Sequence, residues 1–364
     1  MFLDTLRLSA ALTVLALHGK DQWFPSQAHQ AHLPGNMAHA AVVVFFVLSG
    51  YVIAHTTQGN DRGPVQYAVA RLSRLASMVI PALLVTAVCE MLVMQLDPAL
   101  SAQNTRGFTL IRYIISGAFV NELWFFSAAP PINGPLWSLS FEFWYYLIFG
   151  LWFYGANRSG RGWIPVILGC LIAGPKILLM MPIWLSGCMA YRLRKPRLSA
   201  RFAWIVVACC MGAALLAILS VPPYPYAIGA EQFLFANQFM TDWVIGIFVA
   251  CALWFLPAGQ AERKTGAYAR RVRLVRKAAD LTFPIYVLHF PLLVLYRGIF
   301  STRNDDPVQL GMALGSTLVI CVLLGLVLEK QRFLWTALFT RVLTALRGRL
   351  GRTAAAWLPQ TRTT

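Results

Sequence analysis

Apolar segments, each long enough to cross a lipid bilayer as a helix, dominate this sequence. One crossing needs about 20 apolar residues, and eight clear segments approach that length, at about 2–19, 37–56, 75–95, 136–154, 202–221, 237–256, 280–299 and 309–329. Only 12% of the residues are charged and 58% are hydrophobic, whereas soluble domains carry about twice that charged fraction. The sequence therefore predicts an all-α polytopic membrane protein without a large soluble domain.

Two further apolar regions are less regular. The stretch 163–191 contains Gly174-Pro175-Lys176 near its middle. Because Gly-Pro is a strong helix breaker, we expect two short spans joined by a tight turn. Segment 109–126 contains two charged residues and an asparagine, and is interpreted as an interfacial or re-entrant helix. Together these assignments give ten transmembrane helices with both termini in the cytoplasm.

The basic residues follow the positive-inside rule when the chain is threaded in this way. Of the 31 Lys and Arg residues, 25 fall on the cytoplasmic side, Arg62, Arg158 and Arg161 among them. The net charge of +17 is thus explained by short cytoplasmic loops, and no nucleic-acid partner is expected. An alternative threading makes 109–126 a span and 163–191 one long helix. It also gives ten spans, but it exports Arg158 and Arg161.

The same distribution predicts how the chain is divided. Residues 1–335 are expected to form a single transmembrane domain, and residues 336–364 a basic cytoplasmic tail close to anionic lipid. The composition is compatible with a multi-pass protein of a bacterial inner membrane. The histidines and cysteines show no metal-ligand spacing, so no metal is predicted. The sequence does not indicate an oligomeric state.

The first apolar segment carries two ionisable residues, Arg7 and His18. Eleven helical steps return to nearly the same azimuth, so the two side chains share a stripe and lie about 16 Å apart along the axis. An ionisable residue within a membrane span is costly and by default indicates function. The pair therefore predicts a polar track that runs from one membrane face toward the other.

Two other segments combine polar residues on one helix face. Arg71 and Arg74 are spaced i, i+3 and share a face, where their guanidinium groups suit bidentate phosphate binding. Ser138, Glu142 and Tyr145 are spaced i, i+4, i+7. We expect Glu142 at a depth comparable with His18, where its carboxylate would orient the imidazole and stabilise its protonated form.

Other polar residues of the spans give weaker indications. His289 is predicted either to line the same cavity or to bond a neighbouring helix. Glu90 and Asp242 have no sequence partner, which favours structural hydrogen bonds. His39 precedes the second span on the same side as His18. Gly50 is interpreted as a small residue that lets helices approach closely.

Taken together, these pieces resemble the acyltransferase 3 family of integral membrane acyltransferases, which O-acetylate surface glycans such as O-antigens and exopolysaccharides. The matching motifs occur in family order over most of the chain: Leu3-Asp4-Thr5-Leu6-Arg7 with His18, Phe45-Phe46-Val47-Leu48-Ser49-Gly50-Tyr51, Arg71-x-x-Arg74, Pro135-Leu136-Trp137-Ser138-Leu139-Ser140-Phe141-Glu142 with Tyr145-Tyr146, and Tyr286-x-x-His289-x-Pro291. The acidic residue often found before the Phe-Phe pair is absent here, which indicates a subgroup.

The resemblance implies transfer of an acyl group, most often acetyl, from acyl-CoA to a hydroxyl of a glycan or glycolipid. Acetyl-CoA would be a co-substrate, and no bound cofactor is expected. The phosphates of CoA would lie among Arg71, Arg74 and other cytoplasmic basic residues, with Arg7 on the donor track. His18 would take the proton from the acceptor hydroxyl while Glu142 holds the ring. Further candidates for the cavity, or for stabilising the oxyanion, are Asn133, Trp137, Ser138, Tyr145 and His289.

Some alternatives stay open at this point. Intramembrane ionisable residues and a basic mouth also fit a transporter of a small anion or glycan; many transporter folds have inverted repeats, and none is visible here. An acyltransferase could instead act on a small molecule or a lipid, or transfer a larger group such as succinyl. Direct transfer is preferred over a covalent acyl-enzyme, because no activated Ser or Cys stands out.

Overall fold

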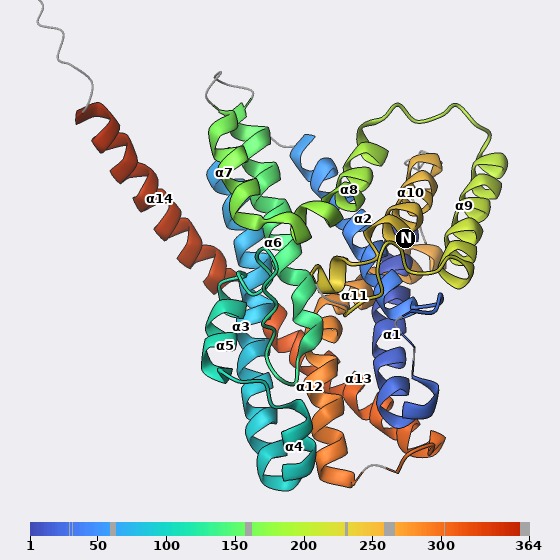
Figure 1. Ribbon diagram of the computed structural model, residues 1–364. Coiled ribbons are helices and arrows are strands. Elements are labelled where there is room, and N and C mark those ends of the chain that lie inside the picture. The colour runs from blue at the N-terminus through green and yellow to red at the C-terminus, as the bar shows by residue number, and fades with distance from the viewer. Residues whose placement is uncertain are drawn as a thin grey trace, which may run out of the picture.

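The computed structural model describes residues 1–28, 30, 32–58, 63–156, 162–229, 232–257, 266–301 and 303–356. Over these residues the chain is helical without a strand, as the sequence predicts. The α-helices are α1 Phe2–Trp23, α2 Met37–Gln58, α3 Pro64–Leu96, α4 Pro98–Asn104, α5 Thr109–Gly117, α6 Trp137–Leu151, α7 Trp163–Ala173, α8 Pro175–Arg192, α9 Ala200–Ser220, α10 Phe239–Phe255, α11 Ala267–Asp280, α12 Thr282–Phe300, α13 Pro307–Lys330 and α14 Arg332–Ala356. Figure 1 shows their arrangement.

Several of these helices are long and apolar enough to cross a membrane. Among the described residues they are α2, α3, α9, α12 and α13, and the bent pair α7 and α8 adds a sixth when counted as one span. Helix α5 has nine residues and is too short to cross a bilayer. The structure thus supports a multi-pass membrane protein. The count of ten spans and the cytoplasmic termini stay predictions, and Arg62, Arg158 and Arg161 lie outside the described residues.

The predicted break at Gly174-Pro175 is confirmed, since α7 and α8 meet there at an angle of 118°. Gly174 has φ +79°, and a Cβ on it would overlap the backbone of Trp124, so only glycine fits this turn. In the next turn Lys176 forms an ion pair with Glu122 at 2.6 Å, and both side chains are fully buried. This pair ties the long loop before α6 to the start of α8.

Helices α2 and α8 pack closely because two glycines face the partner backbone. A Cβ on Gly50 would overlap the carbonyl oxygen of Trp184, and a Cβ on Gly187 would overlap that of Val47. Small residues permit such close approaches between helices in membranes. The predicted packing role of Gly50 is therefore what the structure shows, and the contact brings Ser49 of α2 up to α6.

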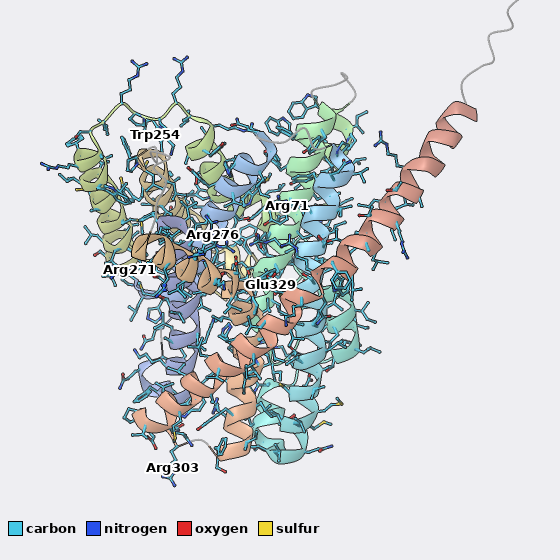
Figure 2. All side chains as sticks on the ribbon, turned by 180° about the vertical axis from the view of Figure 1, so that it is seen from behind. Arg71, Trp254, Arg271, Arg276, Arg303 and Glu329 are labelled. Atoms are coloured by element: carbon cyan, nitrogen blue, oxygen red, sulfur yellow. The ribbon has the colours of Figure 1, made fainter. Side chains whose placement is uncertain are left out.

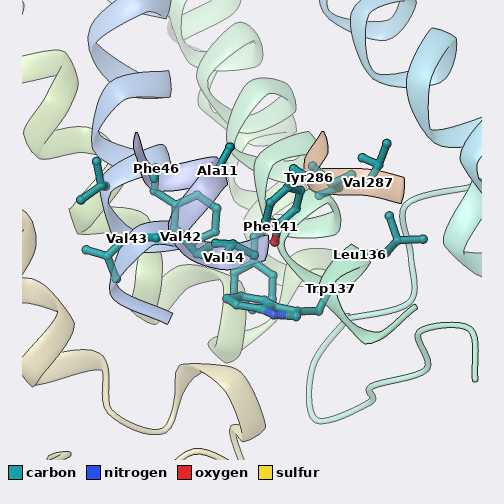
Figure 3. Packing of buried hydrophobic residues seen from close by; sticks show 14 of the residues in the cluster. Ala11, Val14, Val42, Val43, Phe46, Leu136, Trp137, Phe141, Tyr286 and Val287 are labelled. Carbon is teal, nitrogen blue, oxygen red and sulfur yellow. The ribbon is translucent and has the colours of Figure 1, made fainter. Parts of the chain in front are cut away.

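Buried apolar residues fill the centre of the bundle, where α1, α2, α6 and α12 meet. Figure 3 shows Phe46, Trp137 and Phe141 gathered beside Val14 and Tyr286. The rings of Phe46 and Phe141 are stacked with centroids 6.2 Å apart. This core holds the helices that carry the polar residues of the next section in fixed positions.

The C-terminal helix α14 leaves the bundle obliquely (Figure 1). It packs against α3 and continues without interruption across residue 335, where the sequence analysis placed the end of the transmembrane domain. The division into domains at 335 and 336 stays a prediction, and residues 357–364 of the tail lie outside the described part of the chain. The start of the predicted tail is thus a helix that lies against a membrane span.

Candidate active site

A cleft opens between α1, α2, α3, α6 and α12. Its walls are mostly apolar, and its polar lining consists of Arg7, Ser49, Arg71, Arg74, Ser138, Glu142, Tyr146, Thr282 and Tyr286. Three of the residues that the sequence predicts for donor binding therefore converge here from two helices. We call this space the arginine cleft.

The three arginines come from α1 and α3. Arg7 lies in the second turn of α1, and the i, i+3 spacing of Arg71 and Arg74 directs both side chains into the cleft from α3. Arg71 donates a hydrogen bond from Nη2 to Thr56 at 3.1 Å, and its guanidinium lies over the rings of Tyr67 and Tyr146, 5.8 and 5.9 Å from their centroids.

Like charges this close repel one another. Arg7 and Arg74 are near enough for an unfavourable interaction, which Glu142 partly offsets. Glu142 is the single carboxylate in the lining. With three cations facing one anion, the cleft is suited to a ligand that carries several negative charges, such as phosphates.

Glu142 belongs to a hydrogen-bond network within this cleft. Ser49 donates to its Oε1 at 2.7 Å, and the Tyr146 hydroxyl donates to the same oxygen. The indole of Trp184 donates to Ser49 Oγ at 3.2 Å. The carboxylate is therefore oriented by side chains of α2 and α6, at the level of Arg7.

His18 has different partners. Its ring is stacked on that of His289, with centroids 5.4 Å apart and planes inclined by 22°, and the edge of Phe290 completes the contact. His18 lies about 16 Å further along α1 than Arg7, whereas Glu142 shares the cleft with Arg7. The predicted pairing of Glu142 with His18 is thus not found, because α6 presents Glu142 at the Arg7 level.

The hydrogen bonds of His289 define its protonation pattern. Nδ1 faces the carbonyl oxygens of Tyr286 at 2.8 Å and Ile285 at 3.1 Å. Carbonyl oxygens only accept, so Nδ1 carries the proton. In the neutral ring Nε2 is then an acceptor, and it is buried without a hydrogen-bond partner. This buried nitrogen can therefore accept a hydrogen bond from a polar group of a substrate.

Tyr286 lies between the arginine cleft and the stacked rings of His18 and His289. Its hydroxyl lies 2.7 Å from that of Ser138 at the inner wall of the arginine cleft. One turn further along α12, the ring of His289 contacts that of Tyr286 at 6.1 Å. A polar route of side chains therefore leads from the three arginines, past Ser138 and Tyr286, to the two stacked histidines.

Four predicted cavity residues lie outside the lining of the arginine cleft: His289, whose ring bonds carbonyls of its own helix, and three others. Tyr145 is fully buried against Phe46 and Trp184, because from Glu142 the i+4 residue Tyr146, rather than the i+3 residue, turns into the cleft. The ring of Trp137 stacks on His39 and on Phe235.

Asn133, the third of them, ties the loop before α6 to its neighbours. Its amide donates to Thr86 at 2.9 Å and to the Val287 carbonyl at 3.0 Å. Its own oxygen is buried without a partner. Trp137 and Asn133 therefore support the site from outside the cleft lining.

Ser49 and Tyr146 line the cleft but were not among the predicted cleft residues. The contact between His39 and Asp242 was not predicted either. The imidazole Nε2 of His39 lies 2.8 Å from the Asp242 carboxylate, and both side chains are buried. Gln238 donates to the other carboxylate oxygen at 2.8 Å. The spacing of Glu142 and Tyr146 at i, i+4 was a usable signal, whereas 203 residues separate His39 from Asp242.

Within the described ranges, no group of three or more His, Cys, Asp or Glu residues could hold a metal ion.

Comparisons with known proteins concern the chain as a whole. No curated protein and no solved structure matches the chain. A family model described as an acyltransferase domain, Acyl_transf_3, matches residues 2–326, a range that contains the arginine cleft and both stacked histidines. The chain therefore belongs to the acyltransferase 3 family of membrane acyltransferases.

Proposed function

We propose that this protein transfers an acyl group, most simply acetyl, from acyl-CoA to a hydroxyl of a cell-surface or lipid-linked glycan at a bacterial inner membrane. Arg7, Arg71 and Arg74 bind the phosphates of the donor in the arginine cleft. His18 acts as the general base at the inner end of the polar route. Membership of the family supplies the reaction class, and the acceptor and the acyl group rest on the sequence resemblance.

The observation that carries the proposal is the convergence of three guanidinium groups around one carboxylate. CoA is a polyanion with a long, thin pantetheine arm. If the phosphates remain at the arginines, the arm can extend past Ser138 and Tyr286 toward His18. The distance of about 16 Å between the levels of Arg7 and His18 is then spanned by the arm, and the thioester arrives beside the imidazoles.

The chemistry at that end is a direct acyl transfer. The His18 imidazole accepts the proton of the acceptor hydroxyl as its oxygen attacks the thioester carbonyl carbon. The C–S bond then breaks, and the departing thiolate takes the proton from the imidazolium. The His289 ring contacts His18 and holds it in place. The hydroxyl of Ser138 is a candidate donor to the oxyanion that forms on the carbonyl oxygen.

A reconstituted assay tests the proposal. Purified protein in nanodiscs receives isotope-labelled acetyl-CoA and a panel of bacterial surface glycans, and mass spectrometry follows the label. Transfer of the label to a glycan hydroxyl supports the proposal. Transport of the anion or glycan in proteoliposomes without acyl transfer would show a transporter, and a trapped acyl-protein adduct in the absence of acceptor would overturn direct transfer.

A further inference from the structure

A second cavity lies beside the arginine cleft and is almost entirely apolar. It is a groove of about 340 Å³ between α3, α6 and α14. Its lining includes Ala68, Leu72 and Leu75 of α3, Phe143 and Leu147 of α6, and Leu343 of α14. The segment of α3 that borders the groove runs from Pro64 to Leu75. This segment is about 16 Å long. We call it the apolar groove.

The position of the groove limits what can occupy it. Helix α3 is one of the candidate membrane spans, and α14, which contributes Leu343 to the lining, exposes Phe333, Leu334 and Leu338. Apolar side chains exposed beside a membrane span are suited to contact with hydrocarbon. An elongated apolar space on such a surface fits a hydrocarbon chain.

The groove has a charged wall on the side of the arginine cleft. Arg71 and Tyr146 line both spaces, and the Nε of Arg71 is buried without a hydrogen-bond partner. Arg332, at the start of α14, interacts electrostatically with Arg71 and Arg74, and Glu329 partly offsets its charge. In Figure 2, Arg71 and Glu329 lie near the place where α14 crosses α3.

The combination of an apolar channel and neighbouring guanidinium groups matches an amphiphile with an anionic head. We propose that the apolar groove binds one acyl chain of an anionic membrane phospholipid, with its phosphate on the side of Arg71 and Arg332. The lipid fills the space between α14 and the bundle. Arg332 and α14 lie beyond the residues matched by the family model, whereas the groove lining apart from Leu343 lies within them.

A fatty acyl chain of the donor is the competing occupant. This comparison rests on the proposed function: when the phosphates of CoA lie at Arg71 and Arg74, the pantetheine arm carries the acyl group away toward His18. The apolar groove, which lies on the other side of Arg71, would then remain unfilled by the donor. A membrane phospholipid, whose phosphate and acyl chains are close together, fits the geometry better.

Lipid retention measured without any donor tests the proposal. Wild-type protein and two variants are purified in mild detergent with phosphatidylglycerol, and native mass spectrometry counts the bound lipid. Ala68→Phe fills the groove. Leu84→Phe, on the same helix but at a side chain 66% exposed and outside the groove lining, is the matched control. We expect Ala68→Phe to lower occupancy about tenfold or more, because the chain loses its buried surface, and Leu84→Phe to leave it unchanged.

Wild-type protein provides a second readout that does not depend on the folding of a variant. A phosphatidylglycerol with a photoreactive group on its acyl chain should label peptides that contain Leu72, Leu147 or Leu343. Labelling confined to exposed positions such as Val88, or equal lipid retention by the two Phe variants, would overturn the proposal. Displacement of the lipid by palmitoyl-CoA but not by acetyl-CoA would assign the groove to the donor. None of these measurements depends on acyl transfer, so failure of the proposed function is detected separately.

Discussion

At the scale of single residues, the two stacked histidines carry the reactive end of the proposed route. Replacing His18 with alanine should abolish acyl transfer, with a loss of about 10²- to 10⁴-fold, since that is the usual contribution of a positioned general base. The measurement is acetyl transfer by purified protein at saturating donor. His55→Ala is the matched control, because His55 is exposed and contacts only Tyr191 among the ring partners described for it. Retained activity in His18→Ala would remove this residue from the catalytic role.

A substitution in the arginine cleft is expected to affect the KM for the donor more than the KM for the acceptor. Arg74→Ala should raise the KM for acetyl-CoA about tenfold or more, because a charge-assisted contact to a phosphate is lost, and should change the KM for the acceptor little. Steady-state kinetics with each substrate varied in turn provide the measurement. Arg271→Ala, on the exposed side of α11, is the control for loss of positive charge. Equal effects on both substrates would indicate structural damage instead.

The arrangement of site residues could be predicted where the residues are close together in the sequence, and not where they come from helices far apart in the chain. Arg71 and Arg74 share a face because i, i+3 spacing on a helix guarantees it, and both line the cleft. The partner of His18 could not be predicted in this way. Its contact with His289 joins α1 to α12, and it depends on how those helices pack. The sequence therefore pointed to several side chains that line the cleft but paired Glu142 with the wrong level of the bundle.

At the scale of elements, the close contact of α2 with α8 can be tested through its glycines. Gly187→Ala places a Cβ against the Val47 carbonyl, and backbone atoms on both sides leave no room for adjustment. We expect a loss of about 1–3 kcal/mol of stability, together with weaker activity, because Ser49 of α2 orients Glu142. Thermal unfolding in detergent measures the effect.

The chain provides a control for that substitution. Gly212 lies within α9, and a Cβ on it meets no atom within 4 Å. Gly212→Ala should therefore leave the melting temperature unchanged or raise it slightly, since alanine favours helix. If Gly187→Ala behaved like Gly212→Ala, the tight α2–α8 contact would not exist as described.

The elements that the sequence predicted and those that it did not differ in composition. Each of the eight clear apolar segments corresponds to a helix or most of one, and the Gly-Pro pair correctly predicted the break at 174. Helix α11, Ala267–Asp280, and helix α14 lie in regions interpreted as a basic loop and tail. Both are rich in arginine, and a criterion of about 20 consecutive apolar residues does not detect charged helices.

At the scale of the whole molecule, the direction of the arginine cleft relative to the membrane is the remaining question. The cleft lies near the N-terminal ends of α1 and α3. Helix α6 ends on the same side, because Tyr146 accepts a hydrogen bond from Tyr67 near the start of α3, whereas Asn133, before α6, donates to Thr86 further along α3. Acyl-CoA is made in the cytoplasm, so the proposed function requires this side to be cytoplasmic. The predicted ten-span threading favours the same orientation, because it puts 25 of the 31 basic residues on the cytoplasmic side.

Residue 158, which follows the end of α6 in the chain, reports on this orientation. A single cysteine replacing Arg158, in a background without the seven native cysteines, should react with a membrane-impermeant maleimide only after the inner membrane is opened. A cysteine replacing Arg303, in the segment between α12 and α13, serves as the reference for the opposite face and should react in intact cells. Labelling of position 158 from outside would place the arginines opposite the CoA pool, and both the ten-span threading and the assignment of the cleft to a cytoplasmic donor would then fail together.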